Sequence, residues 1–410
     1  MEWRSIPQGP EDVVFKVNRQ FNECGDPCKV SLGIGAYRDG NGNPLVLDAV
    51  TRAKAELASL PPQQWTHEYQ PIAGHSDFLR AAQDLVLGNE LRSELGDRLV
   101  GMQTMSGTGA CRLGFEFVSR FGAHSDFILL PDPTWANHRS IAKFSRLRVL
   151  EYRYIDNSRP RTPQLDLEGM LEDLKAAPRG TTVVLHMCAH NPTGVDPTAD
   201  QWERIASVVQ ERELQPLFDN AYQGFASGDL EGDASSVRMF VRRGMHPLIA
   251  CSFAKNMGLY GERIGALHVV CPTISAANST ISQLKIEARA MYSNPPLFGA
   301  QVALKVMTVP ELKSLWEEEL RGMAERIQSM RQSLRQLLED KVPEQTWHHV
   351  TDQIGMFSYT GLTKEQVYHC AEHGAVFMLD TGRISMAGLN EHNLEHVAKA
   401  MANSISACPN

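Results

Sequence analysis

Short apolar runs alternate with helical patterns between about residues 126 and 271. Strands and helices that alternate in this way favour a largely parallel sheet with helices on both faces. Ligands bind beyond the carboxyl ends of the strands in such sheets, so the residues that follow each run are the candidates for chemistry. The predicted strands are residues 127–130, 147–152, 182–186, 214–219, 248–252 and 264–270.

Length and charge narrow the class of protein. The chain has 410 residues, and its 40 basic and 48 acidic residues give a net charge of −8. At roughly 100–200 residues per domain, this length predicts two or three domains, and the negative charge argues against a nucleic-acid partner. No apolar stretch reaches the roughly 18 residues of a membrane helix. Residues 1–21 resemble neither a signal peptide nor a transit peptide, so we expect a cytoplasmic protein with no membrane partner.

No metal centre is expected. The eight cysteines are too sparse for a disulfide framework. Cys24 and Cys28 lack the second pair that closes a zinc site, so we expect them in a surface loop. Two histidine pairs stand four residues apart without the His-Glu-x-x-His pattern, and we expect surface or capping roles for them. These pairs are His369 with His373 and His392 with His396.

A long helix is predicted from Pro310 onward, because proline suits the first turn of a helix. From Trp316, apolar residues recur at alternating spacings of four and three. A coiled coil shows the same spacing, but we favour one long helix that is buried against the body and leads into a second domain. Further on, Thr363 and Gln366 predict a capping box, and Gly374 predicts a helix end.

Small residues at 105–111 precede a helical pattern at 113–121. At a helix N-terminus such residues leave N–H groups free beside the positive end of the helix dipole, which suits a phosphate. Arg112 stands where a dinucleotide fingerprint needs its third glycine, so NAD is disfavoured. The alternative is an ordinary capped helix.

Two other strand ends carry ionisable residues. Asp219 ends one apolar run, with Tyr222 three residues later, and a carboxylate there is costly to desolvate without a cationic partner. Lys255 follows another run, near Ser252 and Arg263, and desolvation with neighbouring cations can turn such an amine into a nucleophile. The alternatives are a helix N-cap for the aspartate and a surface position for the lysine.

Trp135 and Asn191 follow two more predicted strands. Taken alone, Trp135 is explained by core packing and Asn191 by a turn. Together with the residues above, they place a phosphate cradle, an amine nucleophile, a buried anion and a flat aromatic ring at adjacent strand ends. One cofactor needs that whole set, pyridoxal phosphate.

The chain resembles the aspartate aminotransferases of fold type I, subgroup Iα, in their eukaryotic cytosolic form. The resemblance runs from about Phe15 to Met401. Its motifs are VSLGIGAYRD at 30–39, HEYQPI at 67–72, SGTG at 106–109, CAHNPTG at 188–194, FDNAYQGFAS at 218–227, SFAKN at 252–256, YSNPP at 292–296 and GRI at 382–384.

The resemblance implies an α/β fold with a large domain, in which helices flank a mostly parallel seven-stranded sheet, and a smaller α+β domain. Residues 1–44 would form an N-terminal arm and part of the small domain, residues 45–315 the large cofactor-binding domain, and residues 316–410 the small C-terminal domain. It also implies a homodimer whose active sites are shared across the interface.

The resemblance assigns the catalytic roles to Lys255, Asp219 and Tyr222. Lys255 would carry pyridoxal phosphate as a Schiff base, and Asp219 would pair with its pyridine nitrogen. Tyr222 and Asn191 would hydrogen-bond its phenolic oxygen, and Trp135 would stack on its ring. The phosphate would be held by Ser106, Gly107, Thr108, Ser252 and Arg263, with Tyr69 from the second subunit.

The resemblance further implies that Arg383 binds the substrate α-carboxylate, and that Arg289 of the second subunit binds the side-chain carboxylate. His138 and His186 would support Asp219. The groups that would assist at the α-carboxylate are Asn191, Trp135 and the Gly35 backbone.

The implied reaction is reversible amino-group transfer between L-aspartate and 2-oxoglutarate, giving oxaloacetate and L-glutamate by a ping-pong mechanism on small dicarboxylic amino and oxo acids. Ala254, Met257, Asn220 and Ser385 depart from the residues usual at these places, which leaves rate and fine specificity open. The alternatives are an aminotransferase of broader aromatic or kynurenine specificity, an amino-acid racemase, or a non-catalytic binding protein on the same fold.

Overall fold

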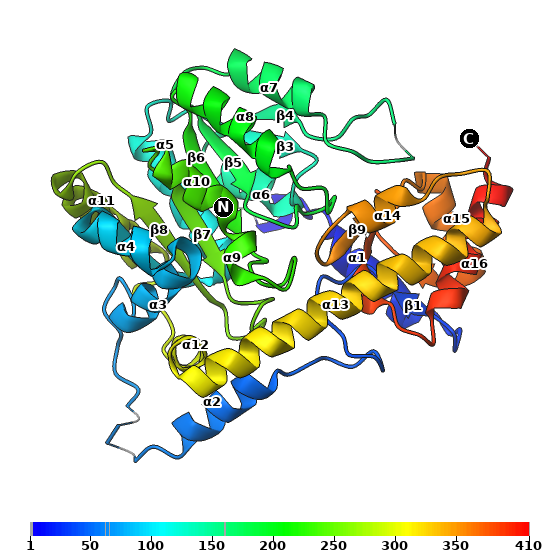
Figure 1. Ribbon diagram of the computed structural model, residues 1–410, viewed down its shortest axis with the longest axis horizontal. Coiled ribbons are helices and arrows are strands. Elements are labelled where there is room, and N and C mark those ends of the chain that lie inside the picture. Colours follow the sequence, from blue (N-terminus) through cyan, green and yellow to red (C-terminus); the bar gives the residue numbers. More distant parts are fainter. Residues whose placement is uncertain (1–2, 62, 65, 160, 410) are drawn as a thin grey trace.

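A seven-stranded sheet forms the centre of the computed structural model, which describes residues 3–61, 63–64, 66–159 and 161–409. The strand order is β2-β8-β7-β6-β5-β3-β4, and β8 runs opposite to the other six strands. This confirms the predicted mostly parallel sheet (Figure 1). The strands are β2 (Leu99–Met105), β3 (Phe127–Asp132), β4 (Arg148–Arg153), β5 (Thr182–His186), β6 (Gln215–Asn220), β7 (Leu248–Ser252) and β8 (Ile264–Val270).

β2 is absent from the six predicted strands. Its residues include Gln103 and Thr104, both fully buried, so the segment does not look like an apolar run. The Gln103 amide explains its burial: Nε2 donates to the Pro296 carbonyl at 2.6 Å, and Oε1 accepts from the His75 N–H at 3.1 Å. Residues far away in the chain thus supply the hydrogen bonds of Gln103, a polar side chain that is untypical of a buried strand.

Each face of the sheet has its own hydrophobic core. In β5, Val184 packs into one core with α5 and α11, whereas Val183 and Leu185 pack into the other with α7, α8 and α10. Because both faces are covered, β5 is buried along its whole length and shows no alternation. The helices around the sheet are α3 (Ser76–Leu87), α4 (Asn89–Leu95), α5 (Ser106–Phe121), α6 (Ala136–Phe144), α7 (Leu167–Ala176), α8 (Ala199–Glu211), α9 (Leu230–Asp233), α10 (Ser235–Arg242), α11 (Ile274–Met291) and α12 (Phe298–Thr308).

The long helix α13 (Pro310–Lys341) connects this body to a smaller α+β part (Figure 1). The prediction of one long helix is confirmed, and its buried face contacts α2, α12, α14 and α16 of the same chain. The N-terminal strand β1 pairs in parallel with β10, so the beginning of the chain joins its end. The remaining elements are α1 (Val13–Glu23), β1 (Val30–Ser31), α2 (Asp48–Ala58), α14 (His348–Asp352), β9 (Phe357–Tyr359), α15 (Lys364–Gly374), β10 (Val376–Phe377), β11 (Arg383–Ser385) and α16 (Leu394–Ala407).

Two local predictions can be compared directly. Thr363 and Gln366 form the predicted capping box of α15. The helix does end at Gly374, but Ala375 is the residue in the left-handed conformation, at φ 50°. A Cβ on Gly374 would lie 2.7 Å from the Ala400 Cβ, so the glycine is required by helix packing and not by its φ angle.

None of the helices in the described ranges is long and apolar enough to cross a membrane.

Arg331 of α13 holds the segment that precedes and includes β9. It is 2% exposed, and its guanidinium donates to the carbonyls of Val350, Gly355 and Phe357 at 2.9, 2.8 and 2.5 Å. Burial lowers its pKa to about 9. Phe357 is therefore fixed from the long helix.

Replacing Arg331 by methionine leaves three buried carbonyls without their donor. We expect Arg331→Met to lower the free energy of unfolding by about 3 kcal/mol. Arg335→Met, one turn further along α13, removes contacts with Glu339 and Thr351 and should cost under about 1 kcal/mol. Urea unfolding of both variants measures the difference, and equal losses would contradict the role of Arg331.

Candidate active site

Asp219 lies near the carboxyl end of β6, in register with His186 of β5 and Ala250 of β7. Its carboxylate is buried, at 8% residue exposure. His138, fully buried on α6, places Nε2 3.2 Å from Asp219 Oδ2. The Asp219 carboxylate is thus a buried charge that would be unfavourable alone, and His138 of a second element is its partner.

Hydrogen bonds determine which nitrogen of each histidine carries a proton. The Asn191 N–H faces His186 Nδ1 at 3.4 Å, so the proton of the neutral His186 ring is on Nε2, 3.2 Å from Thr134 Oγ1. Burial lowers the pKa of His186 to about 3, which keeps this ring neutral. Thr134 Oγ1 then donates to His138 Nδ1 at 2.9 Å, which leaves the Nε2 proton of His138 facing Asp219.

Opposing effects set the charges of Asp219 and Lys255. Burial raises the pKa of Asp219, but the proton of His138 and the charge of Lys255 outweigh it, and the pKa is lowered. Burial also lowers the pKa of Lys255. Asp219 opposes this decrease, and Arg263 and Arg383 add to it. The cleft thus combines an ionised carboxylate with an amine that loses its proton more easily than a surface lysine.

Tyr222 lies between the lysine and the smaller part of the chain. Lys255 Nζ is 5.4 Å from the centroid of the Tyr222 ring, and Phe357 meets that ring edge-on at 6.2 Å. Burial raises the pKa of Tyr222, so the phenol is protonated and can donate a hydrogen bond. Trp135, half-buried at the start of α6, stands edge-on to His138 at 5.1 Å.

A cradle of small residues forms where β2 meets α5. Ser106 adopts φ 62°, and its Oγ lies 3.2 Å from Ser252 Oγ. A Cβ on Gly107 would stand 2.9 Å from the Ser252 Cβ, so no larger residue fits there. The Arg263 carbonyl accepts from the Ser106 N–H at 3.1 Å. Ser106, Gly107, Ser252 and the backbone of Arg263 thus come together at a helix N-terminus, with Thr108 one residue further in α5.

Arg383 is a buried cation without an anion. It is 6% exposed, its Nη2 donates to the Gly33 carbonyl at 2.6 Å, and its Cζ stands 4.2 Å from the centroid of the Phe357 ring. Its Nε is buried with no partner, and no carboxylate of the described residues pairs with it. Burial lowers its pKa to about 10, so it stays charged at neutral pH. A Cβ on Gly35 would lie 2.8 Å from Phe357 Cζ, so glycine is needed beside this ring.

Tyr69 and Arg289 lie on the surface, away from these residues. Tyr69 is 86% exposed, and Arg289 donates to Ser293 Oγ and Asn294 Oδ1 at 2.6 and 3.3 Å. Asn294 also donates to the Gln70 carbonyl at 2.6 Å, which brings the two predicted interface residues together. Within the described ranges, neither side chain bonds to the site around Lys255.

Three residues contribute to the site although the sequence assigned no role to them. Thr134 connects the two histidines, Phe357 packs against Arg383, and Tyr260 accepts from the Tyr37 N–H at 2.9 Å. Only Thr134 had a signal, its place beyond a predicted strand. Phe357 looks like an ordinary apolar residue, and no spacing connects it with Arg383.

One group of possible metal ligands overlaps the site. Ligand atoms of Cys111, His138 and Asp219 lie within 4.8 Å of one another. Burial raises the pKa of Cys111 well above its ordinary value, so its sulfur is a thiol and not the thiolate that metals prefer. We assign no metal here, and the expectation of none stays a prediction.

A family model for aminotransferases of class I and II matches residues 27–401. The chain belongs to the class I and II aminotransferase family. A curated relative from rice (Oryza sativa subsp. japonica), named aspartate aminotransferase, cytoplasmic, is 46% identical over 396 residues, which cover 97% of this chain and 96% of that protein.

Solved structures of other aminotransferases agree with this membership. The aspartate aminotransferase from Saccharomyces cerevisiae cytoplasm matches with a TM-score of 0.93, 39% identity and 99% of both chains covered. The aromatic-amino-acid aminotransferase from Burkholderia pseudomallei, solved covalently bound to pyridoxal phosphate, matches with a TM-score of 0.93 and 36% identity over 98% of this chain and 99% of that one. The fold expected from the sequence motifs is thus confirmed.

The contact between His138 and Asp219 predicts a change in pH dependence. In His138→Phe, Asp219 loses the His138 proton that opposes the effect of burial and keeps the charge of Lys255, so its pKa should rise, and the acidic limb of kcat/KM should move to higher pH. The lowered pKa of the wild type contributes stability above the unfolded pKa of about 3.9, and this contribution is lost as pH falls through the folded pKa.

His268→Phe is the matched control, because His268 is equally buried and its ring nitrogens have no partner. Rate–pH profiles of both variants provide the comparison. An acidic limb that stays at its wild-type position in His138→Phe would contradict the proposed electrostatics.

Proposed function

We propose that this aminotransferase is an aspartate aminotransferase, which transfers an amino group reversibly between L-aspartate and 2-oxoglutarate. Arg383, a buried cation whose Nε has no partner, supports binding of a carboxylate, and the observation that carries the choice of aspartate is the 46% identity to the rice relative over 97% of this chain. The names of the rice and yeast relatives support the same substrates. A panel of amino donors that includes phenylalanine, tyrosine and kynurenine tests this against a broader specificity, which the name of the Burkholderia relative favours.

The site suits pyridoxal phosphate. In the cradle of Ser106, Gly107 and Ser252, glycine is needed at 107 because a Cβ there would lie 2.9 Å from the Ser252 Cβ, and Thr108 and Arg263 would complete the phosphate site. The buried carboxylate of Asp219 would face the pyridine nitrogen, with Trp135 against the ring. Lys255 is the residue that would carry the cofactor as a Schiff base, and Tyr222 and Asn191 would bind its phenolic oxygen.

Pyridoxal phosphate supplies an electron sink for the charge that develops when a proton leaves the substrate Cα. The chain supplies the rest. The lowered pKa of Lys255 leaves its amine able to take the proton from the substrate Cα and to hold it at Nζ. His138 helps to keep the Asp219 carboxylate ionised. This carboxylate would stabilise a positive charge on the cofactor ring at the far side of the cleft.

Two arginines would select the substrate. Guanidinium binds a carboxylate through two parallel, charge-assisted hydrogen bonds. Arg383 would bind the α-carboxylate that every amino acid has, and Arg289 the second carboxylate of a dicarboxylic acid. Because Arg289 and Tyr69 are exposed side by side, we propose a homodimer in which both reach the partner's site.

Three further features complete the proposal. Residues 1–44 form an arm and part of a small domain, residues 45–315 a large domain, and residues 316–410 the rest of the small domain; Met1, Glu2 and Asn410 lie outside the described residues. The protein acts in the cytoplasm, as the name of the rice relative says of that protein. A non-catalytic binding role is disfavoured, because Lys255, Asp219 and Arg383 are all present.

Lys255→Ala should lower the rate of transfer from aspartate to 2-oxoglutarate by about 1,000-fold or more, because the amine that moves the Cα proton is gone. Borohydride reduction should fix the cofactor to Lys255 in the wild type and to no residue in the variant. Lys305→Ala removes a lysine that pairs with Glu56 outside the site and serves as the control. Substantial transfer by Lys255→Ala would refute the mechanism.

Arg289→Asp should lower kcat/KM for aspartate and glutamate by about 100-fold or more, while alanine, which has no second carboxylate, is affected far less. Arg383→Lys should lower kcat/KM for aspartate, glutamate and alanine alike. Equal losses for the three substrates in Arg289→Asp would rule out its role as the second clamp.

Hybrid dimers test the sharing of sites. Lys255→Ala and Arg289→Asp chains, unfolded and refolded together, should regain activity, because one site per hybrid then combines an intact Lys255 with an intact Arg289 from its partner. No regain would place Arg289 in the site of its own chain.

A further inference from the structure

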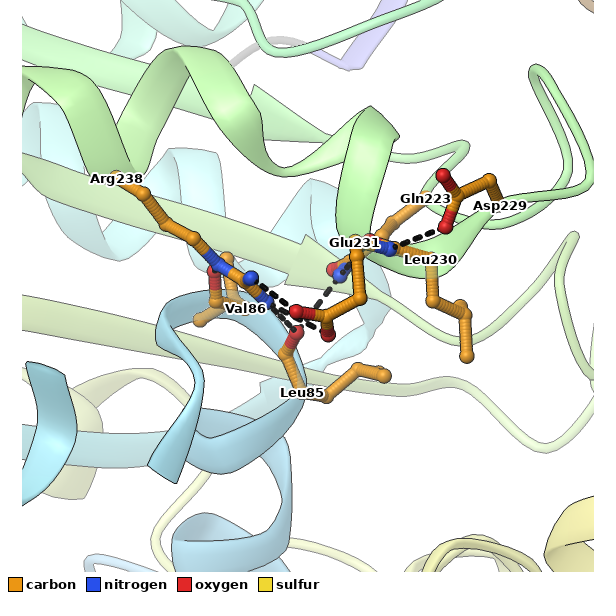
Figure 2. Close-up of polar contacts among 7 residues, drawn as sticks. All are labelled: Leu85, Val86, Gln223, Asp229, Leu230, Glu231 and Arg238. Carbon is orange, nitrogen blue, oxygen red and sulfur yellow. Dashed lines mark hydrogen bonds and ion pairs between the residues drawn. The ribbon is translucent and has the colours of Figure 1, made fainter. Parts of the chain in front are cut away.

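A buried network of amides lies behind the site. Gln223, next to Tyr222 in the chain, is 1% exposed. Its Nε2 donates to the carbonyls of Leu85 at 2.7 Å and Leu230 at 3.0 Å, as Figure 2 shows. Its Oε1 accepts from Asn220 Nδ2 at 2.9 Å. The turn that carries Tyr222 is thus anchored to α3 and to the start of α9.

The same network reaches the residue after Lys255. Asn256 is 2% exposed, and its Nδ2 donates to the Gln223 carbonyl at 3.2 Å. The Asn256 carbonyl accepts from Trp316 Nε1 at 2.6 Å. Trp316 is fully buried on α13. The backbone beside Lys255, the backbone beside Tyr222 and the long helix are therefore joined by consecutive hydrogen bonds.

The end of α3, to which Gln223 is bonded, is also held by Arg238. Arg238, 7% exposed, donates to the Val86 carbonyl at 3.0 Å and to the Leu85 carbonyl at 3.2 Å, and it pairs with Glu231 at 2.5 Å (Figure 2). The end of α3 thus meets two buried donors, from Arg238 and Gln223. A groove of about 770 Å³ opens beside these residues, with Leu85, Leu230 and Trp316 among its lining residues.

We propose that Gln223, Asn256 and Trp316 are positioning residues, which set the placement of Tyr222 relative to Lys255 and couple both to α13. The proposal rests on the proposed aminotransferase function. None of the three needs to touch the substrate; they act through the backbone of the residues that do. Catalytic groups must be held within about 0.5 Å of their working geometry, and a displacement of about 1 Å can cost 100-fold in rate.

Asn220 extends this network at one of the positions where the chain departs from the motif of its family. Serine is usual there, and its side chain is one atom shorter than that of asparagine. Asn220 uses the added length to reach Gln223 Oε1, while its own Oδ1 is buried without a partner. An unsatisfied buried acceptor is costly, so the bond to Gln223 comes at the expense of stability, as expected for a residue kept for positioning.

Trp316→Phe is the decisive variant, because it removes one N–H and keeps an aromatic ring in the core. We expect kcat to fall by about tenfold and KM to change less than about twofold. The pH midpoint of the absorbance of the bound cofactor should also shift, since the setting of Lys255 changes. Trp347→Phe is the matched control: Trp347 is 2% exposed and its Nε1 has no partner, so kcat and midpoint should stay at wild-type values.

Asn220→Ser is a milder second variant that keeps the test valid should the loss of the indole prevent folding. It should lower kcat in the same direction as Trp316→Phe, with no loss in melting temperature. The proposal is overturned if Trp316→Phe and Asn220→Ser keep the wild-type kcat and absorbance midpoint, whatever their melting temperatures. A wild type that neither binds pyridoxal phosphate nor transfers amino groups would instead refute the proposed function.

Discussion

The burial of the Asp219 carboxylate is the constraint on which the rest of the site depends. A charge at 8% exposure is unfavourable unless proton donors face it. The sheet alone offers none, because the neighbouring residues of β5 and β7 are His186 and Ala250. α6 supplies His138, and Thr134 and His186 orient its ring. The helix after β3 must therefore lie over the end of β6, which determines how the segments beyond the strands are arranged.

Positive charge dominates the other side of the cleft, although the whole chain carries a charge of −8. Burial lowers the pKa of Lys255 and that of Arg383, and the charges of Arg263 and Arg383 lower the pKa of Lys255 further. No carboxylate of the described residues pairs with Arg383, so this side of the cleft favours an anionic ligand. The same excess lowers the pKa of Lys255, so a single arrangement accounts for both ligand binding and the readiness of the amine to exchange a proton.

The long helix α13 connects these elements mechanically. At one point Trp316 bonds to the residue after Lys255, and four turns later Arg331 holds the backbone of Phe357, which packs against Arg383. One rigid element therefore contacts the surroundings of both Lys255 and Arg383. Any motion of the smaller part against the sheet has to move Arg383 with Phe357, since both belong to the paired strands β9 and β11.

The sequence by itself determined the elements whose signals are local. Apolar runs marked six of the seven strands, and Thr363 and Gln366 marked a helix start. Asp219 and Lys255 could be named because they lie at or just beyond the end of an apolar run, and Ser106 because small residues precede a helical pattern. It missed β2, since Gln103 and Thr104 look polar until their partners are known. Gly374 marked the end of α15 correctly, but no glycine marks the left-handed backbone of Ala375. Only the tertiary structure decided that Thr134 bridges two histidines, that Phe357 faces Arg383 and that Gln223, Asn256 and Trp316 meet. These contacts join residues that are far apart in the chain. The periodicity of a sequence describes only neighbours along one helix or strand, whereas side-chain contacts between elements depend on how whole elements pack.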